Sequence, residues 1–81
     1  MIYFPRSRTK RKRRVDRRMK YLVGEVRYQK RMSLRRLAER ARISKSYLQR
    51  IEAGEVSPSL EIMLRLAKEL DVPLGQLYRE K

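Results

Sequence analysis

One short segment of the chain carries polar side chains at the spacing of a single helix face. Residues 44–54 read SKSYLQRIEAG, with a hydroxyl that can cap a helix at one end and a glycine that can stop it at the other. Between them, Lys45, Ser46, Gln49 and Arg50 recur at helical spacing. Their amino, guanidinium, amide and hydroxyl groups form hydrogen bonds, so the chemistry they offer is the binding of a polar or anionic surface.

Catalytic chemistry is poorly supplied by this sequence. The chain has no cysteine and no histidine, which excludes disulfides, catalysis by either residue and zinc sites of the usual ligands. Its 81 residues suffice for one small core without an enclosed cavity. Glu25, Glu39, Glu61 and Glu69 are better explained as solvent-face partners of basic residues than as acid–base pairs. We therefore expect no enzyme, no metal and no cofactor.

Charge is the strongest compositional signal and is spread unevenly. The chain has 23 Lys and Arg against 9 Asp and Glu, a net charge of +14 and a pI near 11.1. Residues 1–20 carry +9 and residues 21–50 carry +7, whereas residues 51–81 carry −2. One end of the molecule is thus electropositive, which indicates a polyanionic partner, with nucleic acid ahead of a membrane surface.

The N-terminal segment repeats like charge without apolar periodicity. We expect residues 1–14 to be a disordered basic tail and residues 15–81 to form the domain. A phosphate-binding role is favoured for the tail cations Lys10, Arg11, Lys12, Arg13 and Arg14. A minor-groove arm, an RNA contact or an expression-vector remnant stay open as alternatives. Residues 1–4 could pair as an edge strand or be frayed.

No targeting signal is recognisable. The first four residues are apolar, but Pro5 and a basic run follow at once, where a signal peptide needs a longer apolar stretch. No segment is long and apolar enough for a transmembrane helix. We expect a soluble, cytoplasmic protein without membrane contact.

Apolar periodicity and capping residues predict an all-α domain of five helices. The first helix is expected at about 16–30. Ser33, Ser44 and Ser59 are expected to cap the second, third and fourth, which end before Arg42, at Gly54 and before 71–73. Leu74, Leu77 and Tyr78 suggest a short fifth helix.

The second and third predicted helices are joined by a turn of three or four residues. This is the geometry of a helix-turn-helix, whose second helix can enter the DNA major groove. Over about 19–78 the chain resembles the phage repressor and Cro type of helix-turn-helix family, also called the xenobiotic-response-element family. The matching stretches are SLRRLAERARIS, SYLQRIEAGEVSPSL and LRLAKELDVPLGQL. The resemblance implies a five-helix, lambda-repressor-like domain that binds double-stranded DNA.

The resemblance also implies roles for individual residues. It makes residues 45–53 the recognition helix, whose base-reading positions are Lys45, Ser46, Gln49 and Arg50. Arg and Lys donate to guanine O6 and N7, and Gln pairs with adenine. It further nominates contacts to the sugar-phosphate backbone, which are Ser33, Arg35, Ser57 and Ser59. We add Arg42 and Ser44 to these backbone contacts, and we expect Tyr47 either to pack or to touch a phosphate.

Family members often pair an arginine of the first helix with a glutamate of the third, here Arg27 and Glu52, and we expect this ion pair to orient the recognition helix. Three positions depart from the family pattern. Leu34 stands where many members have a glutamine that reaches the DNA backbone. Arg31 and Arg42 replace common glycines, so a positive φ at either would cost about 1 kcal/mol.

Two functions of different class fit these observations. The first is a sequence-specific transcriptional regulator, most simply a repressor that binds a palindromic site as a homodimer. Its axis is expected in the region of Leu74, Leu77 and Tyr78, two of which are expected to close the core. The second is a protein-binding adaptor on the same fold: an antitoxin that clamps a toxin, or a bridging factor between activators and the transcription machinery.

Overall fold

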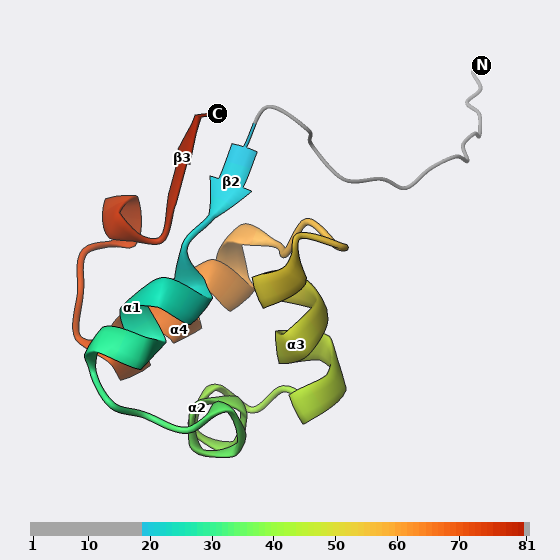
Figure 1. Ribbon diagram of the computed structural model, residues 1–81, viewed down its shortest axis with the longest axis vertical. Coiled ribbons are helices and arrows are strands. Elements are labelled where there is room, and N and C mark those ends of the chain that lie inside the picture. Colours follow the sequence, from blue (N-terminus) through green and yellow to red (C-terminus); the bar gives the residue numbers. More distant parts are fainter. Residues whose placement is uncertain (1–18, 81) are drawn as a thin grey trace.

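The computed structural model describes residues 19–80, which form four α-helices, one 3-10 turn and a pair of short strands (Figure 1). None of the helices in this range is long and apolar enough to cross a bilayer. In chain order the elements are β2 (Met19–Tyr21), α1 (Val23–Gln29), α2 (Leu34–Ala41), α3 (Lys45–Ala53), α4 (Leu60–Leu70), η2 (Leu74–Gln76) and β3 (Tyr78–Glu80).

Three serines start the last three α-helices, as the sequence predicts. Ser33, Ser44 and Ser59 have extended backbones, and each hydroxyl oxygen accepts a hydrogen bond from the backbone N–H three residues later. The donor-to-acceptor distances, from the amides of Arg36, Tyr47 and Ile62, are 3.0, 3.0 and 3.2 Å. Each bond satisfies one backbone donor that a helix start otherwise leaves without a partner. The predicted starts of α2, α3 and α4 are confirmed.

The same helices end on left-handed residues. Gly54, with φ 78°, closes α3 at the expected place. Arg42 (φ 63°) closes α2 and Asp71 (φ 57°) closes α4, while Arg31 (φ 58°) lies in the connection before α2. Arg31 and Arg42, which stand where the family commonly has glycine, therefore both have a positive φ, and this conformation costs about 1 kcal/mol for a residue other than glycine.

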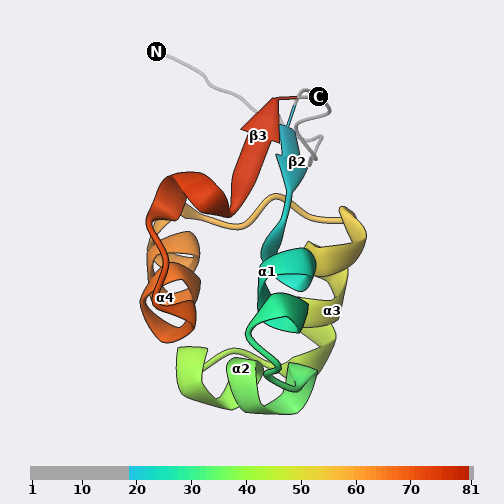
Figure 2. The ribbon, with the colours of Figure 1, turned by 60° about the vertical axis from the view of Figure 1, so that its left-hand side comes forward.

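The core lies where the four helices meet, with α2 packed against both α3 and α4 (Figure 2). In the described range all buried side chains are apolar. They are Val23, Val26, Leu37, Ala38, Ala41, Leu48, Ile51, Met63, Leu66, Ala67, Leu70 and Leu77. The apolar residues that recur at helical spacing in the sequence form this core, because that spacing places them on one face of each helix.

The two ends of the described chain correct the all-α, five-helix prediction. The first helix begins at Val23 rather than near Asp16, and residues 19–21 form β2 instead. The expected fifth helix is only the 3-10 turn η2, after which the chain extends as β3. Pairing with β2 satisfies the backbone groups of Tyr78–Glu80, so the chain extends there and does not continue as a helix.

The strands are antiparallel, and Tyr21 lies opposite Tyr78 in the register. The backbone N–H of Leu22 donates to the carbonyl of Leu77 at 2.7 Å, which extends the pairing by one step. Leu77 is fully buried in the core, so its side chain closes the core and is not available to a second copy. The predictions made for residues 1–14, including the tail, lie outside the described residues.

Candidate nucleic-acid interface

Helix α3 turns a polar face to solvent because its period places the apolar residues on the opposite side. Leu48 and Ile51 are fully buried, and Tyr47 is half-buried against the core. The four predicted base-reading side chains are all exposed; they are Lys45, Ser46, Gln49 and Arg50. The structure thus presents these four groups together, with the capped N-terminus of α3 beside Lys45.

A shallow hollow lies along this face and includes a residue that the sequence analysis left without a role. Ser46, Gln49 and Arg50 line it together with Ala53 and Glu55. The backbone N–H of Glu55 donates to the carbonyl of Arg50 at 2.9 Å, which folds the chain back at the end of α3. Glu55 therefore brings a carboxylate to a surface of donors, where it can accept from a cytosine amino group and repel a phosphate.

The predicted backbone-contacting residues surround this face. Arg35 and Arg42 are exposed at the two ends of α2, and Ser57 is exposed in the loop after α3. The three capping serines, Ser33, Ser44 and Ser59, already accept one hydrogen bond each. Their hydroxyl hydrogens can still donate to an incoming acceptor. Leu34, which replaces the family glutamine, packs partly buried against the core and offers no polar group.

The cationic side chains of the described range fall into two sets. Four form ion pairs: Lys20 with Glu25 (3.8 Å), Arg27 with Glu52 (2.7 Å), Arg40 with Glu69 (3.0 Å) and Arg65 with Glu61 (2.8 Å). The others have no carboxylate within ion-pair distance in that range; they are Lys30, Arg31, Arg35, Arg36, Arg42, Lys45, Arg50, Lys68 and Arg79.

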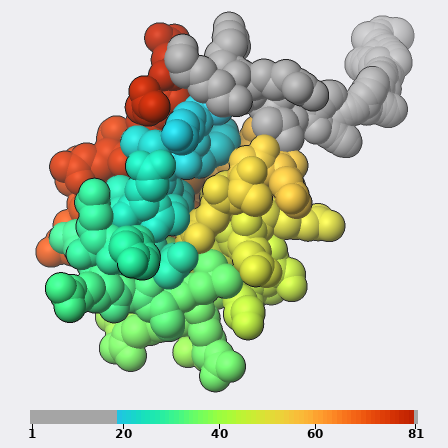
Figure 3. All heavy atoms as spheres, in the orientation of Figure 1, coloured from blue at the N-terminus to red at the C-terminus, as the bar shows by residue number. Residues whose placement is uncertain are grey.

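Most of the unpaired cations belong to one stretch of the chain, residues 30–50. This stretch runs from the end of α1 through α2 and α3. In the space-filling view these green to yellow segments lie next to one another on one face (Figure 3). Positive charge that no protein carboxylate neutralises attracts a polyanion and strengthens its binding at low salt.

Arg27 and Glu52 are joined, as the family resemblance implies. The Arg27 Nε donates to Glu52 Oε2 at 2.7 Å, and its Nη2 donates to Oε1 at 3.1 Å. The side chains are only 19% and 15% exposed, so solvent screens the pair weakly. The hydrogen bonds to Glu52 raise the pKa of Arg27 above its usual value; burial opposes this effect, and the nearby negative charge adds to it.

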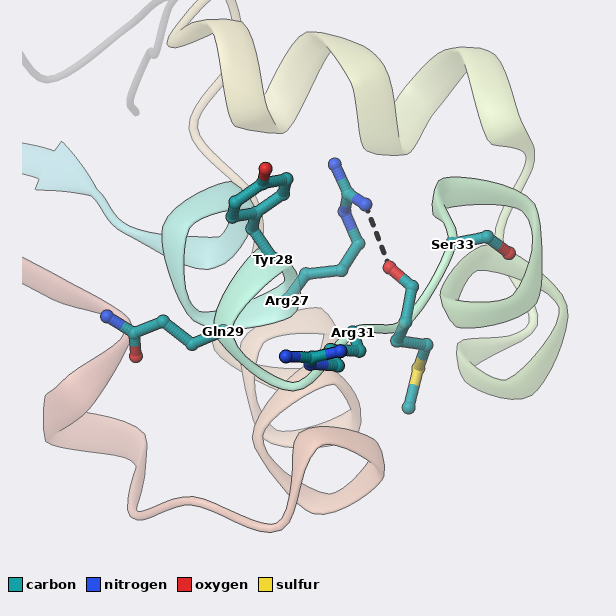
Figure 4. A pocket seen from close by; sticks show the side chains of 6 residues that line it. Arg27, Tyr28, Gln29, Arg31 and Ser33 are labelled. Carbon is teal, nitrogen blue, oxygen red and sulfur yellow. Dashed lines mark hydrogen bonds between the residues drawn. The ribbon is translucent and has the colours of Figure 1, made fainter.

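Arg27 also forms part of a second hollow, at the corner between α1 and α2. Its Nη1 donates to the carbonyl oxygen of Met32 at 2.9 Å (Figure 4). Tyr28, Gln29, Arg31 and Ser33 complete the lining. Tyr28 is 80% exposed, an unusual state for a large aromatic side chain. Its hydroxyl and the Arg31 guanidinium can both donate to a phosphate oxygen, a role the sequence analysis did not assign to Tyr28.

Comparisons with known proteins agree with this geometry. The model of a family described as helix-turn-helix matches residues 23–77. The chain is 37% identical over 60 residues to the HTH-type transcriptional regulator SinR of Bacillus licheniformis, a match that covers 73% of this chain and 54% of that protein.

Several solved structures resemble the fold, including the following two. The restriction-modification controller protein C.AhdI from Aeromonas hydrophila superposes with a TM-score of 0.65 and 31% identity, over 67% of this chain and 82% of that one. A complex of the SinR and SinI proteins gives a TM-score of 0.62 and 34% identity, over 67% of this chain and 53% of that one. The chain spans between about a third and about half of the length of the curated relatives it matches.

Proposed function

Because the chain belongs to the helix-turn-helix family, of the phage repressor and Cro type, we propose that it binds double-stranded DNA through α3 and regulates transcription. The observation that carries the proposal is the uncompensated positive charge of residues 30–50 around the exposed polar face of α3. The names of the matched relatives support regulation as the outcome of binding. This activity requires access to DNA, and we place it in the cytoplasm.

In this proposal α3 lies in the major groove with its exposed polar face toward the bases. Arg50 and Lys45 donate to guanine O6 and N7, Gln49 pairs with adenine, and Ser46 tolerates either base. The capped N-terminus of α3 places its positive dipole end toward the negative groove. Glu55, at the far end of the same hollow, disfavours approach of a phosphate there and so helps to set the register of the helix on DNA.

Phosphate contacts orient the domain on the duplex without reading sequence. We assign them to Ser33 and Arg35 at the start of α2, to Arg42 and Ser44 in the turn, and to Tyr47 of α3. Ser57 and Ser59 contact the backbone from the loop that follows. The basic residues of the N-terminal segment add attraction that is independent of sequence.

A single domain of this size reads few base pairs, so we propose that the chain acts as a homodimer and represses by covering a promoter. Two recognition helices then enter successive turns of the major groove, about 34 to 36 Å apart. Leu74 and Tyr78 are half-buried in one copy and supply the remaining apolar surface near the expected axis, whereas Leu77 belongs to the core.

Selection of duplexes from a random library at near-physiological salt tests this function. We expect enrichment of an inverted repeat whose half-sites lie one helical turn apart. Enrichment of a single half-site would support base reading by α3 and would exclude binding as a dimer. Binding without any consensus would overturn sequence-specific regulation and leave phosphate attraction as the only interaction.

A protein partner is the second candidate function, as an antitoxin or a bridging adaptor. Leu60 and Leu64, one turn apart on α4, are 64% and 51% exposed, which places two large apolar side chains side by side on the surface. A solved relative is a complex of two proteins. Co-purification with the product of an adjacent gene, lost on changing both leucines to serine, would favour this function. A monodisperse chain that binds its operator without that product would exclude the need for it.

A further inference from the structure

Gly24 lies inside α1, where the backbone does not require glycine. Among the described glycines only Gly54 has a positive φ, so any residue could adopt the conformation of Gly24. Glycine is the least favourable helix residue after proline, because it loses the most backbone freedom on folding. The presence of glycine here therefore calls for a reason outside α1.

A side chain at Gly24 would meet Glu52. A Cβ built on Gly24 lies 3.0 Å from Glu52 Oε1, 3.2 Å from Cδ and 3.4 Å from Cγ. These contacts are tighter than nine in ten that a Cβ makes in proteins, so Glu52 would have to move by a few tenths of an ångström to admit the side chain. An exposed glutamate would swing aside, but Arg27 holds both oxygens of this one, and its side chain is only 15% exposed.

We propose that Gly24 is a positioning residue for base readout: it leaves the space in which Glu52 binds Arg27, and through Glu52 it sets the orientation of α3. The inference rests on the function proposed above. Gly24 itself touches no DNA in this arrangement. It acts because α1 carries both the gap and the arginine, three residues apart on one helix face.

The arginine connects this gap to both helices of the motif. Two guanidinium nitrogens of Arg27, Nε and Nη2, donate to Glu52 of α3. The third, Nη1, donates to the carbonyl of Met32, which directly precedes the residue that caps α2. A methyl group at position 24 pushes the Glu52 carboxylate away and loosens this three-way contact. The reading face of α3 then shifts against the phosphate-binding start of α2, while every cation of the surface is retained.

The test compares Gly24→Ala with Gly75→Ala. Gly75 is the matched control, because its φ is not positive and a Cβ there has no atom within 4 Å. For each variant, the affinity for the selected operator is divided by the affinity for an unrelated duplex, at one salt concentration. We expect Gly24→Ala to lower this ratio by about tenfold, the size of one weakened base contact, with nonspecific affinity unchanged. Gly75→Ala should leave both unchanged.

A second comparison repeats Gly24→Ala in a Glu52→Ala background, where the obstructed carboxylate is gone. We expect no further loss of the ratio there. If Gly24→Ala alone does not fold, recovery of folding in the double variant supports the proposal in the same way, because it identifies Glu52 as the group that excludes the methyl.

Three results would overturn the inference. They are a ratio for Gly24→Ala equal to that of Gly75→Ala, an equal loss with and without Glu52, and failure of the double variant to fold under conditions in which Glu52→Ala alone folds. If the unaltered chain selects no operator, the proposed function fails and this inference fails with it. If the unaltered chain does select an operator, and Gly24→Ala binds it with the same ratio of specific to nonspecific affinity, only this inference fails and the proposed function stands.

Discussion

Arg27 and Glu52 form a two-point contact between α1 and α3 across 25 residues of chain, at 2.7 and 3.1 Å. The Met32 carbonyl takes the remaining guanidinium nitrogen, so one side chain joins three segments. Because Arg27 contacts both the segment before α2 and the reading helix α3, it fixes the position of these two parts of the motif relative to each other. Both the stability of the domain and the alignment of its polar face depend on it.

Glu52→Gln should lower the free energy of unfolding by about 2 kcal/mol, since hydrogen bonds to a charged group contribute about 1.5 to 3 kcal/mol and Arg27 is left with a neutral partner. Chemical denaturation measures the loss. Glu61→Gln is the control, because Glu61 pairs with Arg65 one turn away on the solvent-exposed side of α4, and it should cost at most about 0.5 kcal/mol. Equal losses would mean that the Arg27 contact has no special structural weight.

Arg42→Gly should stabilise the fold and weaken DNA binding at once. Glycine relieves the left-handed backbone at φ 63°, a gain of about 1 kcal/mol, and removes a phosphate contact. Thermal unfolding measures the first effect, and the slope of log affinity against log salt should fall by about 1.

Asp71→Gly separates these two effects. Asp71 has φ 57° at the end of α4 and is no proposed DNA contact, so glycine there should stabilise without changing the salt slope. Aspartate tolerates this conformation better than arginine does, so the gain should be smaller. An unchanged slope for Arg42→Gly would remove Arg42 from the phosphate contacts.

The capping serines explain how much of this fold the sequence could predict. Ser33, Ser44 and Ser59 act within three residues of themselves, so local pattern was enough to place the starts of α2, α3 and α4. The pairing of Tyr21 with Tyr78 joins the two ends of the domain. Strands of three residues show no detectable alternation, and their stability comes from a distant partner.

In the candidate site too, some features follow from local sequence and others depend on contacts between distant parts of the chain. The exposed positions of α3 follow from helical period, and their roles followed from the family resemblance. Glu55 joins the reading surface only because the chain folds back after Gly54, which spacing does not reveal. Gly24 matters because of the position of Glu52, a side chain from another helix. Tertiary approach of this kind has no local signature in one sequence.

Arg50→Ala should cost about 1 to 3 kcal/mol of operator binding and relax preference at one base position, since a bidentate contact to guanine is lost. Repeating the library selection with the variant measures both. Lys68→Ala is the control, because Lys68 is also exposed and without a carboxylate partner in the described range but lies on α4. If Arg50→Ala weakened every duplex equally, α3 would not be the reading helix.

Deletion of residues 1–14 should weaken binding to all duplexes alike and flatten its salt dependence. The segment carries seven Lys and Arg, and each phosphate neutralised contributes about 0.9 to the slope of log affinity against log salt, so the slope should fall by at most about 6. A variant with the same residues in shuffled order should restore the lost affinity, because attraction to phosphate depends on charge and not on sequence. A deletion that changes the selected consensus, unrestored by the shuffled segment, would instead assign these residues to a groove of the DNA.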